Sequence, residues 1–274
     1  MPCLSVCFGY RVSVRYIIAQ LHATHAVMTL TALVQITTKP SHARQPVNPY
    51  IHGHSATMLT ERDCAILQWV TRHGVVTAEH IAGRFFSGQS AAYRRLRKLI
   101  DLGLIRRDPT HYRHPFVIRV TLAGARVAGI GVGAADLHLA DVPHTLALVT
   151  LTERLLVGHP GAVLITEREY RAAQLRALRD GTRPRLGRIP DGVLQLPSKN
   201  EATRIALELD LTNKRRYALT RIITAYIDAF DPRPDGDGFG AVWWYVNPSA
   251  VLRVRAAVEQ ARANDVITVM EWRS

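Results

Sequence analysis

The chain has 274 residues, enough for one large domain or two modest ones with separate cores. Hydrophobic residues make up 47% and charged residues 21%, a globular composition that excludes a chain disordered over its whole length. Thirty-five Lys and Arg residues against 22 Asp and Glu residues give a formal net charge of +13. This excess favours a polyanionic partner, because Lys and Arg gain affinity by displacing counterions from a phosphate backbone.

The three cysteines are Cys3, Cys7 and Cys64. An odd number without a CxxC pair predicts neither a disulfide framework nor a zinc site, and it favours a reducing environment. No apolar run reaches the length of a membrane span. We therefore expect a cytoplasmic protein without a membrane partner.

Residues 1–58 differ from the rest of the chain because they contain no acid, the first being Glu61. Pro40, Pro46 and Pro49 are typical of an unstructured connector. The expectation for 1–58 is a disordered or mis-annotated N-terminal extension, with Met28 or Met58 as the natural start. Mass spectrometry of the native N-terminus would test this expectation.

Residues 59–130 predict three helices followed by a β-hairpin. Thr60 and Asp63 form a capping-box pattern at the start of the first helix, which ends at Gly74. A second helix follows Thr77, and a third begins near Ser90 and stops at Gly103. The inward-facing residues expected on the three helices are Ile66, Leu67, Val70, Ile81, Phe85, Ala92, Leu96, Leu99 and Ile100.

The predicted hairpin has one strand at 104–107, a turn around Asp108 and Pro109, and a second strand at 116–120. Thr121 then caps a short helix that extends to Val127. Three helices followed by a hairpin is the arrangement of a winged-helix domain, in which the third helix enters the major groove. We therefore predict a winged-helix DNA-binding domain over residues 59–130.

Charge supports this interpretation. Residues 59–130 hold 12 Lys and Arg residues against 5 Asp and Glu residues. The polar side of the third helix and the hairpin carry the basic and aromatic residues Tyr93, Arg94, Arg95, Arg97, Lys98, Arg106, Arg107, His111, Arg113 and His114. The alternative is a solvated basic helix face without a ligand.

The residues predicted to bind double-stranded DNA are Tyr93, Arg94, Arg97, Lys98, Arg106, Arg107 and Arg113. We expect Arg94 and Arg97 to contact the groove, and the hairpin arginines to contact the phosphate backbone. No cofactor is expected to be required for this binding.

Residues 137–274 predict an α/β domain. In the strand 204–211, Glu208 and Asp210 share one face because side chains alternate with a period of two. If the strand 191–196 pairs with it, Asp191 lies near Glu208. Three carboxylates would then converge beside Lys214, a pattern that suits Mg²⁺. The alternative is an amphipathic strand whose polar face meets solvent.

Four sequence segments resemble a known family. They are TEREYR at 166–171, RIPDGVLQL at 188–196, ALELDLTNKRRY at 206–217 and AVWWYV at 241–246. Together they resemble the replication-relaxation family, winged-helix proteins of plasmids and integrative elements with a nuclease-like C-terminal domain. The PD of Pro190-Asp191 followed by Glu208 also resembles the PD-(D/E)xK nuclease core. The resemblance covers most of residues 59–272.

The resemblance implies an α+β chain, with an N-terminal winged-helix domain followed by an α/β restriction-endonuclease-like domain. If the core is active, Asp191, Glu208 and Asp210 would bind the metal, and Asp191, Glu208 and Lys214 would be catalytic. The sequence departs from the pattern because Asp210 stands where the nuclease motif has lysine. Lys214 would have to replace it, and Glu167 or Glu153 would supply a further acid.

We therefore expect a DNA-binding accessory or regulatory protein of a mobile genetic element, with a role in replication, mobilisation or plasmid relaxation and a degenerate nuclease-like domain. A homodimer or a mobilisation or replication protein is expected as a further partner. One alternative is a Mg²⁺-dependent PD-(D/E)xK endonuclease. The other is a winged-helix transcriptional repressor whose C-terminal domain only dimerises.

Overall fold

The computed structural model describes residues 59–110, 115–181, 188–197, 203–230 and 238–273. The expected N-terminal extension, 1–58, lies outside the described residues, and so do both start candidates within it. Residues 58–274 group as one compact unit. The elements are helices and mixed sheets, which confirms the predicted α+β class.

The first part of this unit has the predicted order of three helices, a hairpin and a short helix. Its elements are α2 (Glu61–His73), β1 (Val76–Thr77), α3 (Ala78–Phe85), α4 (Gln89–Asp101), β2 (Ile105–Asp108), β3 (Val117–Val120) and α5 (Leu122–Ala128). Strands β2 and β3 pair as an antiparallel hairpin, as predicted. Strand β1, which was not predicted, pairs antiparallel with the other edge of β3.

Side-chain caps set the starts of these helices. Thr60 and Asp63 form the predicted capping box of α2, and Thr77 forms a second box with His80 at α3. Thr121 caps α5 by accepting from the amide of Gly124. Each cap pairs backbone N–H groups that have no partner within the helix, so the three starts are fixed by local sequence.

A single core joins α2, α3, α4, α5 and the hairpin. Its fully buried centre includes Ile66, Leu67, Val70, Ile81 and Leu99. The prediction that Ile100 faces inward is wrong, because this side chain is 36% exposed at the side of α4 nearest the hairpin.

The second part is built on a five-stranded sheet. Its elements are the 3₁₀ helix η2 (Leu139–Asp141), α6 (Val142–Gly158), β4 (Val163–Thr166), α7 (Glu167–Arg179), β5 (Gly192–Leu196), β6 (Thr203–Asp210), α8 (Arg216–Ala229), β7 (Ala241–Val246), the 3₁₀ helix η3 (Pro248–Ala250), α9 (Val251–Gln260) and β8 (Ile267–Glu271). The strand order is β4-β5-β6-β7-β8. The pairs β4–β5 and β5–β6 are antiparallel, and the pairs β6–β7 and β7–β8 are parallel.

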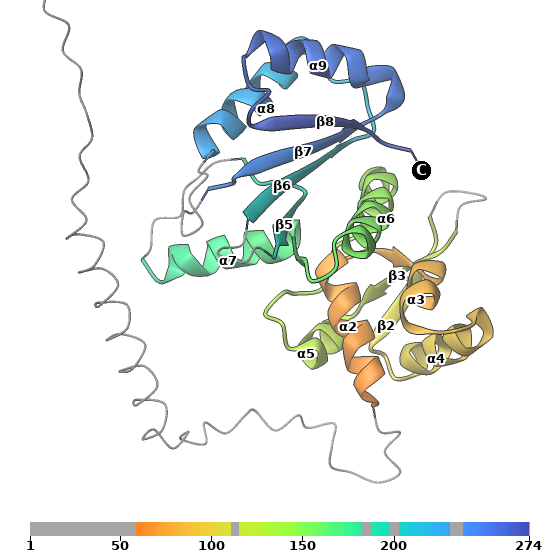
Figure 1. Ribbon diagram of the computed structural model, residues 1–274. Helices are drawn as coiled ribbons and strands as arrows, with labels where there is room; N and C mark the ends of the chain where they lie inside the picture. The colour runs from red at the N-terminus through yellow and green to blue at the C-terminus, as the bar shows by residue number, and fades with distance from the viewer. Residues whose placement is uncertain (1–58, 111–114, 182–187, 198–202, 231–237, 274) are drawn as a thin grey trace, which may run out of the picture. The chain divides into compact units, whose positions relative to one another are not determined.

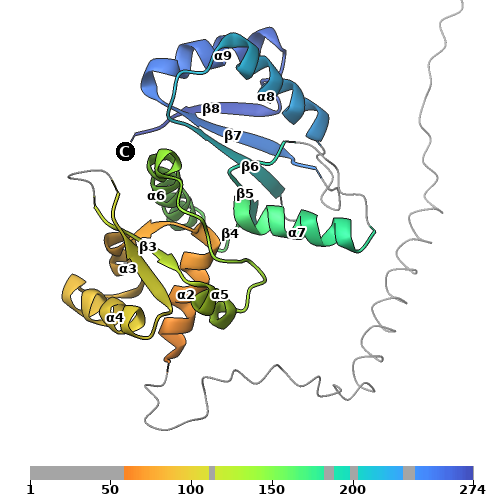
Figure 2. The same ribbon diagram turned by 180° about the vertical axis from the view of Figure 1, so that it is seen from behind.

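The two faces of this sheet belong to different cores. Leu207 and Leu209 of β6 pack in one core with Leu151 and Leu155 of α6. Ala206 lies in the other core, with α8 and α9. Figure 1 shows α8 and α9 together over one face of the sheet, and Figure 2 shows the same layers from behind with β4 in view. Alternation along β6 therefore directs odd-numbered residues to α6 and even-numbered residues to α8.

Helix α6 packs against both parts of the unit. Its Val149 lies in the core of α2, α3, α4 and the hairpin, whereas Leu151 and Leu155 lie under the five-stranded sheet. Trp69 of α2 donates from its indole Nε1 to Glu153 of α6 at 3.2 Å. Helix α6 therefore belongs to both cores, and the two parts of the unit cannot be divided cleanly at the segment between residues 130 and 137.

Candidate functional site

The side chains of α4 divide into a buried and a solvent-facing set. Ala92, Leu96 and Leu99 are buried in the first core. Arg94 and Arg97 are exposed, and Lys98 is half-buried. Among the described residues, these three cations have no carboxylate partner. Their charge is therefore available to an external anion.

Two further residues on the polar side of α4 have partners within the protein. The Tyr93 hydroxyl donates to Glu79 of α3 at 2.8 Å. Arg95 forms an ion pair with Asp63, whose side chain is fully buried in the capping box of α2. Burial alone would raise the pKa of Asp63, but the hydrogen bonds from Arg95 and Thr60 hold it below its usual value. Arg95 therefore fixes α4 against the start of α2.

The hairpin arginines are also unequal. Arg106 donates to Asp108 at 2.9 Å from its Nε, and the same carboxylate accepts from the buried Arg119. Arg107 is exposed and lies over the ring of Phe116, 3.6 Å from its centroid. Arg113, which was predicted to contact DNA, lies outside the described residues together with His111 and His114. Arg107 thus adds an exposed cation on the hairpin to the three cations of α4 that have no carboxylate partner among the described residues.

A groove of about 440 Å³ lies between α4 and the hairpin. Its apolar lining includes Ile100 and Phe116, and Arg97 and Arg107 add guanidinium groups. The misassigned Ile100 is therefore a groove residue. Its i, i+4 relation to Leu96 suggested a core position, but it lines the groove between α4 and the hairpin and is 36% exposed.

The predicted carboxylates of the second part have separate partners. Glu208 is 2% exposed and accepts both hydrogen bonds of a bidentate ion pair from Arg188, each of 2.7 Å. The Tyr226 hydroxyl of α8 donates to the same carboxylate. Burial raises the pKa of Glu208, and the hydrogen bond from Arg188 opposes that rise. Both Glu208 oxygens are thus engaged inside the protein.

Asp210 and Asp191 are each engaged elsewhere. Asp210 forms an ion pair with Lys214 at 2.7 Å, so the lysine does lie beside the end of β6 as predicted. Asp191 accepts from the amide of Leu209 at 2.8 Å and lies 3.4 Å from Nε2 of His144 on α6.

The three predicted carboxylates, Asp191, Glu208 and Asp210, therefore do not form one cluster, although burial and then the nearby charge of Asp191 both raise the pKa of Glu208. Backbone pairing does bring Asp191 next to Glu208, since the Asp191 amide donates to the carbonyl of Leu207. However, the Asp191 side chain turns to α6 and the Glu208 side chain to α8. Within the described ranges, no three His, Cys, Asp or Glu residues form a group that could hold a metal ion. The residues present do not fit the Mg²⁺ site that the resemblance implied.

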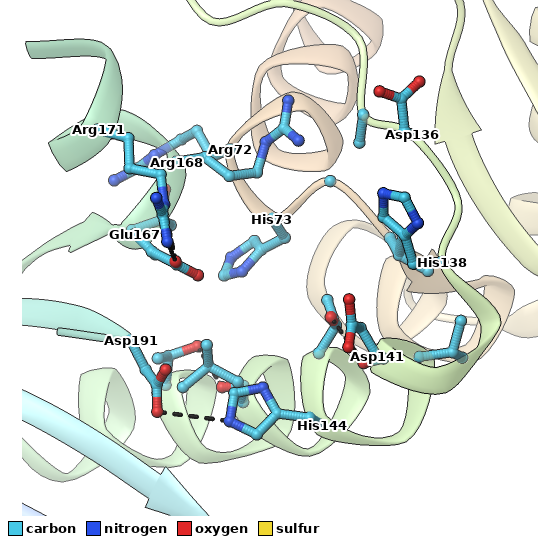
Figure 3. A pocket seen from close by; sticks show the side chains of 18 of the residues that line it. Arg72, His73, Asp136, His138, Asp141, His144, Glu167, Arg168, Arg171 and Asp191 are labelled. Carbon is cyan, nitrogen blue, oxygen red and sulfur yellow. Dashed lines mark hydrogen bonds and ion pairs between the residues drawn. The ribbon is translucent and has the colours of Figure 1, made fainter. Parts of the chain in front are cut away.

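Asp191 lines a polar pocket of about 310 Å³ (Figure 3). The pocket lies among the end of α2, the segment before α6, and the starts of α6 and α7. The ring of His73 points into it, is 9% exposed and has no hydrogen-bond partner among the described residues. Burial lowers the pKa of His73 to about 3, so this imidazole is neutral at pH 7.

The other charges of this pocket are mostly paired. The hydrogen bond with Asp191 raises the pKa of His144. Glu167 accepts from Arg171 at 2.6 Å, which engages one of the two further acids considered from sequence. The second, Glu153, accepts from Trp69 and Arg84. Both acids therefore have structural partners.

Arg168 and Arg72 connect α7 and β4 to α2. Arg168 donates from Nε to the carbonyl of Thr71 at 3.1 Å and from Nη2 to the carbonyl of Gly133 at 2.6 Å. Arg72 forms an ion pair with Glu169 at 2.8 Å. Sequence reasoning missed these contacts, because the partners are 35 or 97 residues apart and no local spacing indicates them.

These features define a class of protein: a basic helix-and-hairpin surface joined by a shared helix to a mixed five-stranded α/β sandwich. The chain belongs to the replication-relaxation family, whose model matches residues 67–242. The match includes α4, the hairpin, Asp191 and the whole of β6. In the part of the chain that the structure describes, no helix is long and apolar enough to cross a membrane.

The remaining comparisons are weaker. No curated protein matches the chain. Among solved structures, a cysteine variant of ZitR from Lactococcus lactis matches with 17% identity and a TM-score of 0.25, covering 58% of this chain and 97% of that one. Wild-type ZitR in complex with DNA matches with 19% identity and a TM-score of 0.25, covering 58% of this chain and 96% of that one. Similarity at this level does not define a shared fold.

Proposed function

We propose that residues 59–130 form a winged-helix domain that binds double-stranded DNA through α4 and the hairpin. The observation that carries the proposal is the division of charge on α4. Arg95 is held by Asp63, whereas Arg94, Arg97 and Lys98 face outward without a carboxylate partner among the described residues. A helix that presents unpaired cations opposite its buried side suits insertion into a groove lined by phosphates.

The hairpin supports the same surface. Arg107 is exposed beside the groove between α4 and the hairpin, so its guanidinium extends the row of cations beyond the helix. In a winged helix the hairpin contacts the backbone next to the groove that the helix enters. The free cations are thus arranged on both structural elements that such a domain uses.

In this proposal the protein is an accessory or regulatory factor of a mobile genetic element. Membership of the replication-relaxation family supports a role connected with DNA. The α/β part acts in assembly, with a second copy or a replication or mobilisation protein, because the three carboxylates of its candidate catalytic site are engaged by Arg188, Lys214 and His144.

The test is the affinity of the full chain for a labelled duplex, measured by fluorescence anisotropy at several salt concentrations. We expect Arg94→Ala/Arg97→Ala to weaken binding at least tenfold, since each good arginine contact contributes about 1–3 kcal/mol. The matched control is Arg126→Ala/Arg179→Ala, which removes the same charge from exposed positions on α5 and α7. Equal weakening by both variants would overturn the assignment to α4.

A parallel reaction with supercoiled plasmid and Mg²⁺ tests the endonuclease alternative. Our proposal predicts binding without cleavage. Nicking by the wild-type chain that disappears in Asp191→Asn would show that the α/β part is an enzyme and would contradict an assembly role.

A further inference from the structure

A second concentration of positive charge lies on α8, α9 and the residues that flank these helices. Residues 211–230 and 247–262 hold seven Lys and Arg residues against two acids. This excess is denser than that of residues 59–130, where 12 Lys and Arg residues stand against 5 acids over twice the length. The seven cations are Lys214, Arg215, Arg216, Arg221, Arg253, Arg255 and Arg262.

Most of this charge is not neutralised within the described part of the chain. Only Lys214 forms an ion pair there, with Asp210. The six arginines are exposed, and the hydrogen-bond partners found for them are neutral, although the charge of Arg255 also acts on Glu271 of β8. Arg216 donates to the side-chain oxygen of Gln260 at 2.9 Å, and Arg253 donates to that of Asn213, also at 2.9 Å.

These two hydrogen bonds give the surface its geometry. Each one crosses between α9 and the start of α8, so arginines from two helices are brought onto one surface. Because Gln260 and Asn213 carry no charge, they orient the guanidinium groups without neutralising them. Two positioned cations on adjacent helices suit a polyanion with regularly spaced charges better than a single small anion.

The opposite sides of both helices are buried, which leaves the arginine side to solvent. Leu219, Ile222 and Ile223 of α8 pack in the sheet core, as do Val251, Val254 and Val258 of α9. Tyr217, which is 75% exposed, lies beneath the guanidinium of Arg221 at 6.0 Å. The surface is therefore rich in arginine, and its exposed apolar side chains include Tyr217 of α8 and Leu252 of α9, which is 82% exposed.

We propose that this α8–α9 surface, formed by Arg215, Arg216, Tyr217, Arg221 and Arg253, binds the phosphate backbone of duplex DNA as a second contact independent of α4. The inference rests on the proposed function for its choice of DNA as the polyanion. The two surfaces belong to different cores, since α4 packs with the hairpin and α8 and α9 pack on the five-stranded sheet. We expect binding by the second surface to be sequence-independent, because phosphate contacts carry no sequence information.

The experiment compares four forms of the full chain on a labelled random-sequence duplex: wild type, Arg94→Ala/Arg97→Ala, Arg216→Ala/Arg253→Ala, and the combination. Arg126→Ala/Arg179→Ala again controls for net charge, and thermal melting confirms that each form is folded. We expect the α8–α9 variant to reduce the slope of log affinity against log salt by about 1.8, at about 0.9 for each lost phosphate contact. The combination should lose the contributions of both pairs.

The outcomes separate the two proposals. An unchanged slope in the α8–α9 variant, with binding lost in the α4 variant, would overturn the second surface and leave the proposed function intact. This result would also be expected if an acidic protein were the partner of α8 and α9. Binding lost only in the α8–α9 variant would support the surface and overturn the role of α4. No loss in either variant would overturn both.

Discussion

Replacing Arg188 with alanine is expected to destabilise the protein strongly. The change removes both hydrogen bonds from a carboxylate that is 2% exposed, leaving Glu208 with only the Tyr226 hydroxyl. Removing one partner of a buried ion pair costs about 3–5 kcal/mol. For a folded unit of this size, about 2–4 °C of melting temperature accompanies each kcal/mol, so the expected drop is about 6–20 °C.

Two measurements distinguish the effect of the unpaired Glu208 charge from that of lost packing: the pH dependence of the stability, and a second substitution at Glu208. Burial already raises the pKa of Glu208, and without Arg188 it rises further. A carboxyl whose folded pKa exceeds its unfolded pKa binds more protons in the folded state, so the deficit should shrink as pH falls from neutral towards 5. In Arg188→Ala/Glu208→Gln no unpaired charge remains at position 208, and the double variant should be more stable than Arg188→Ala alone.

Urea unfolding at several pH values measures all three forms. The reasoning would be refuted by an Arg188→Ala variant within about 0.5 kcal/mol of wild type at pH 7, the range of ordinary surface substitutions. It would also be refuted by a deficit that stays constant with pH, because lost packing does not depend on protonation.

Three further predictions follow from buried groups. Burial lowers the pKa of His73 to about 3, so this residue binds fewer protons in the folded state than in the unfolded state. The free energy of unfolding of the wild type should therefore fall by up to about 1.4 kcal/mol per pH unit as pH drops from about 6.5 towards 3. Urea unfolding of His73→Phe should lack this contribution. Arg95→Met leaves the carboxylate of Asp63 buried without its cation, so thermal melting should show a loss of stability of about 3–5 kcal/mol. Fluorescence anisotropy should show that the DNA affinity is weakened less than in Arg94→Ala/Arg97→Ala. Gly124→Ala would place a Cβ 1.9 Å from the carbonyl oxygen of Leu104. The free energy of unfolding should therefore fall by about 1–3 kcal/mol or more, which thermal melting would detect. An unchanged melting temperature would mean that α5 shifts to relieve the clash.

Features determined by neighbouring residues could be predicted from the sequence. The capping box at Thr60, the hairpin after α4 and the alternation that places Glu208 and Asp210 on one side of β6 all depend on spacings of a few residues. Lys214 lies beside Asp210 for the same reason, being four residues away.

Features that depend on distant partners could not be predicted in this way. Arg95 shares the polar side of α4 with Arg94, and only the position of α2 shows that it is taken by Asp63, 32 residues earlier. Likewise, strand pairing placed Asp191 beside Glu208, but the side chain turns to His144 because α6 covers that face of the sheet. The sequence shows which residues are charged, but only the folded structure shows which partner each charged residue has.

The shared helix α6 limits how this chain could exchange parts with another by recombination. A recombination event between residues 130 and 137 would transfer a DNA-binding half without Val149 and Glu153, which complete its core and hold Trp69. The incoming half would have to match an α6 that evolved with another partner. A crossover after Gly158 would transfer α6 as well, preserving those two contacts but breaking the contacts of Leu151 and Leu155 beneath the sheet. Each crossover therefore disrupts one core, so inheritance of the two halves as a single unit is favoured.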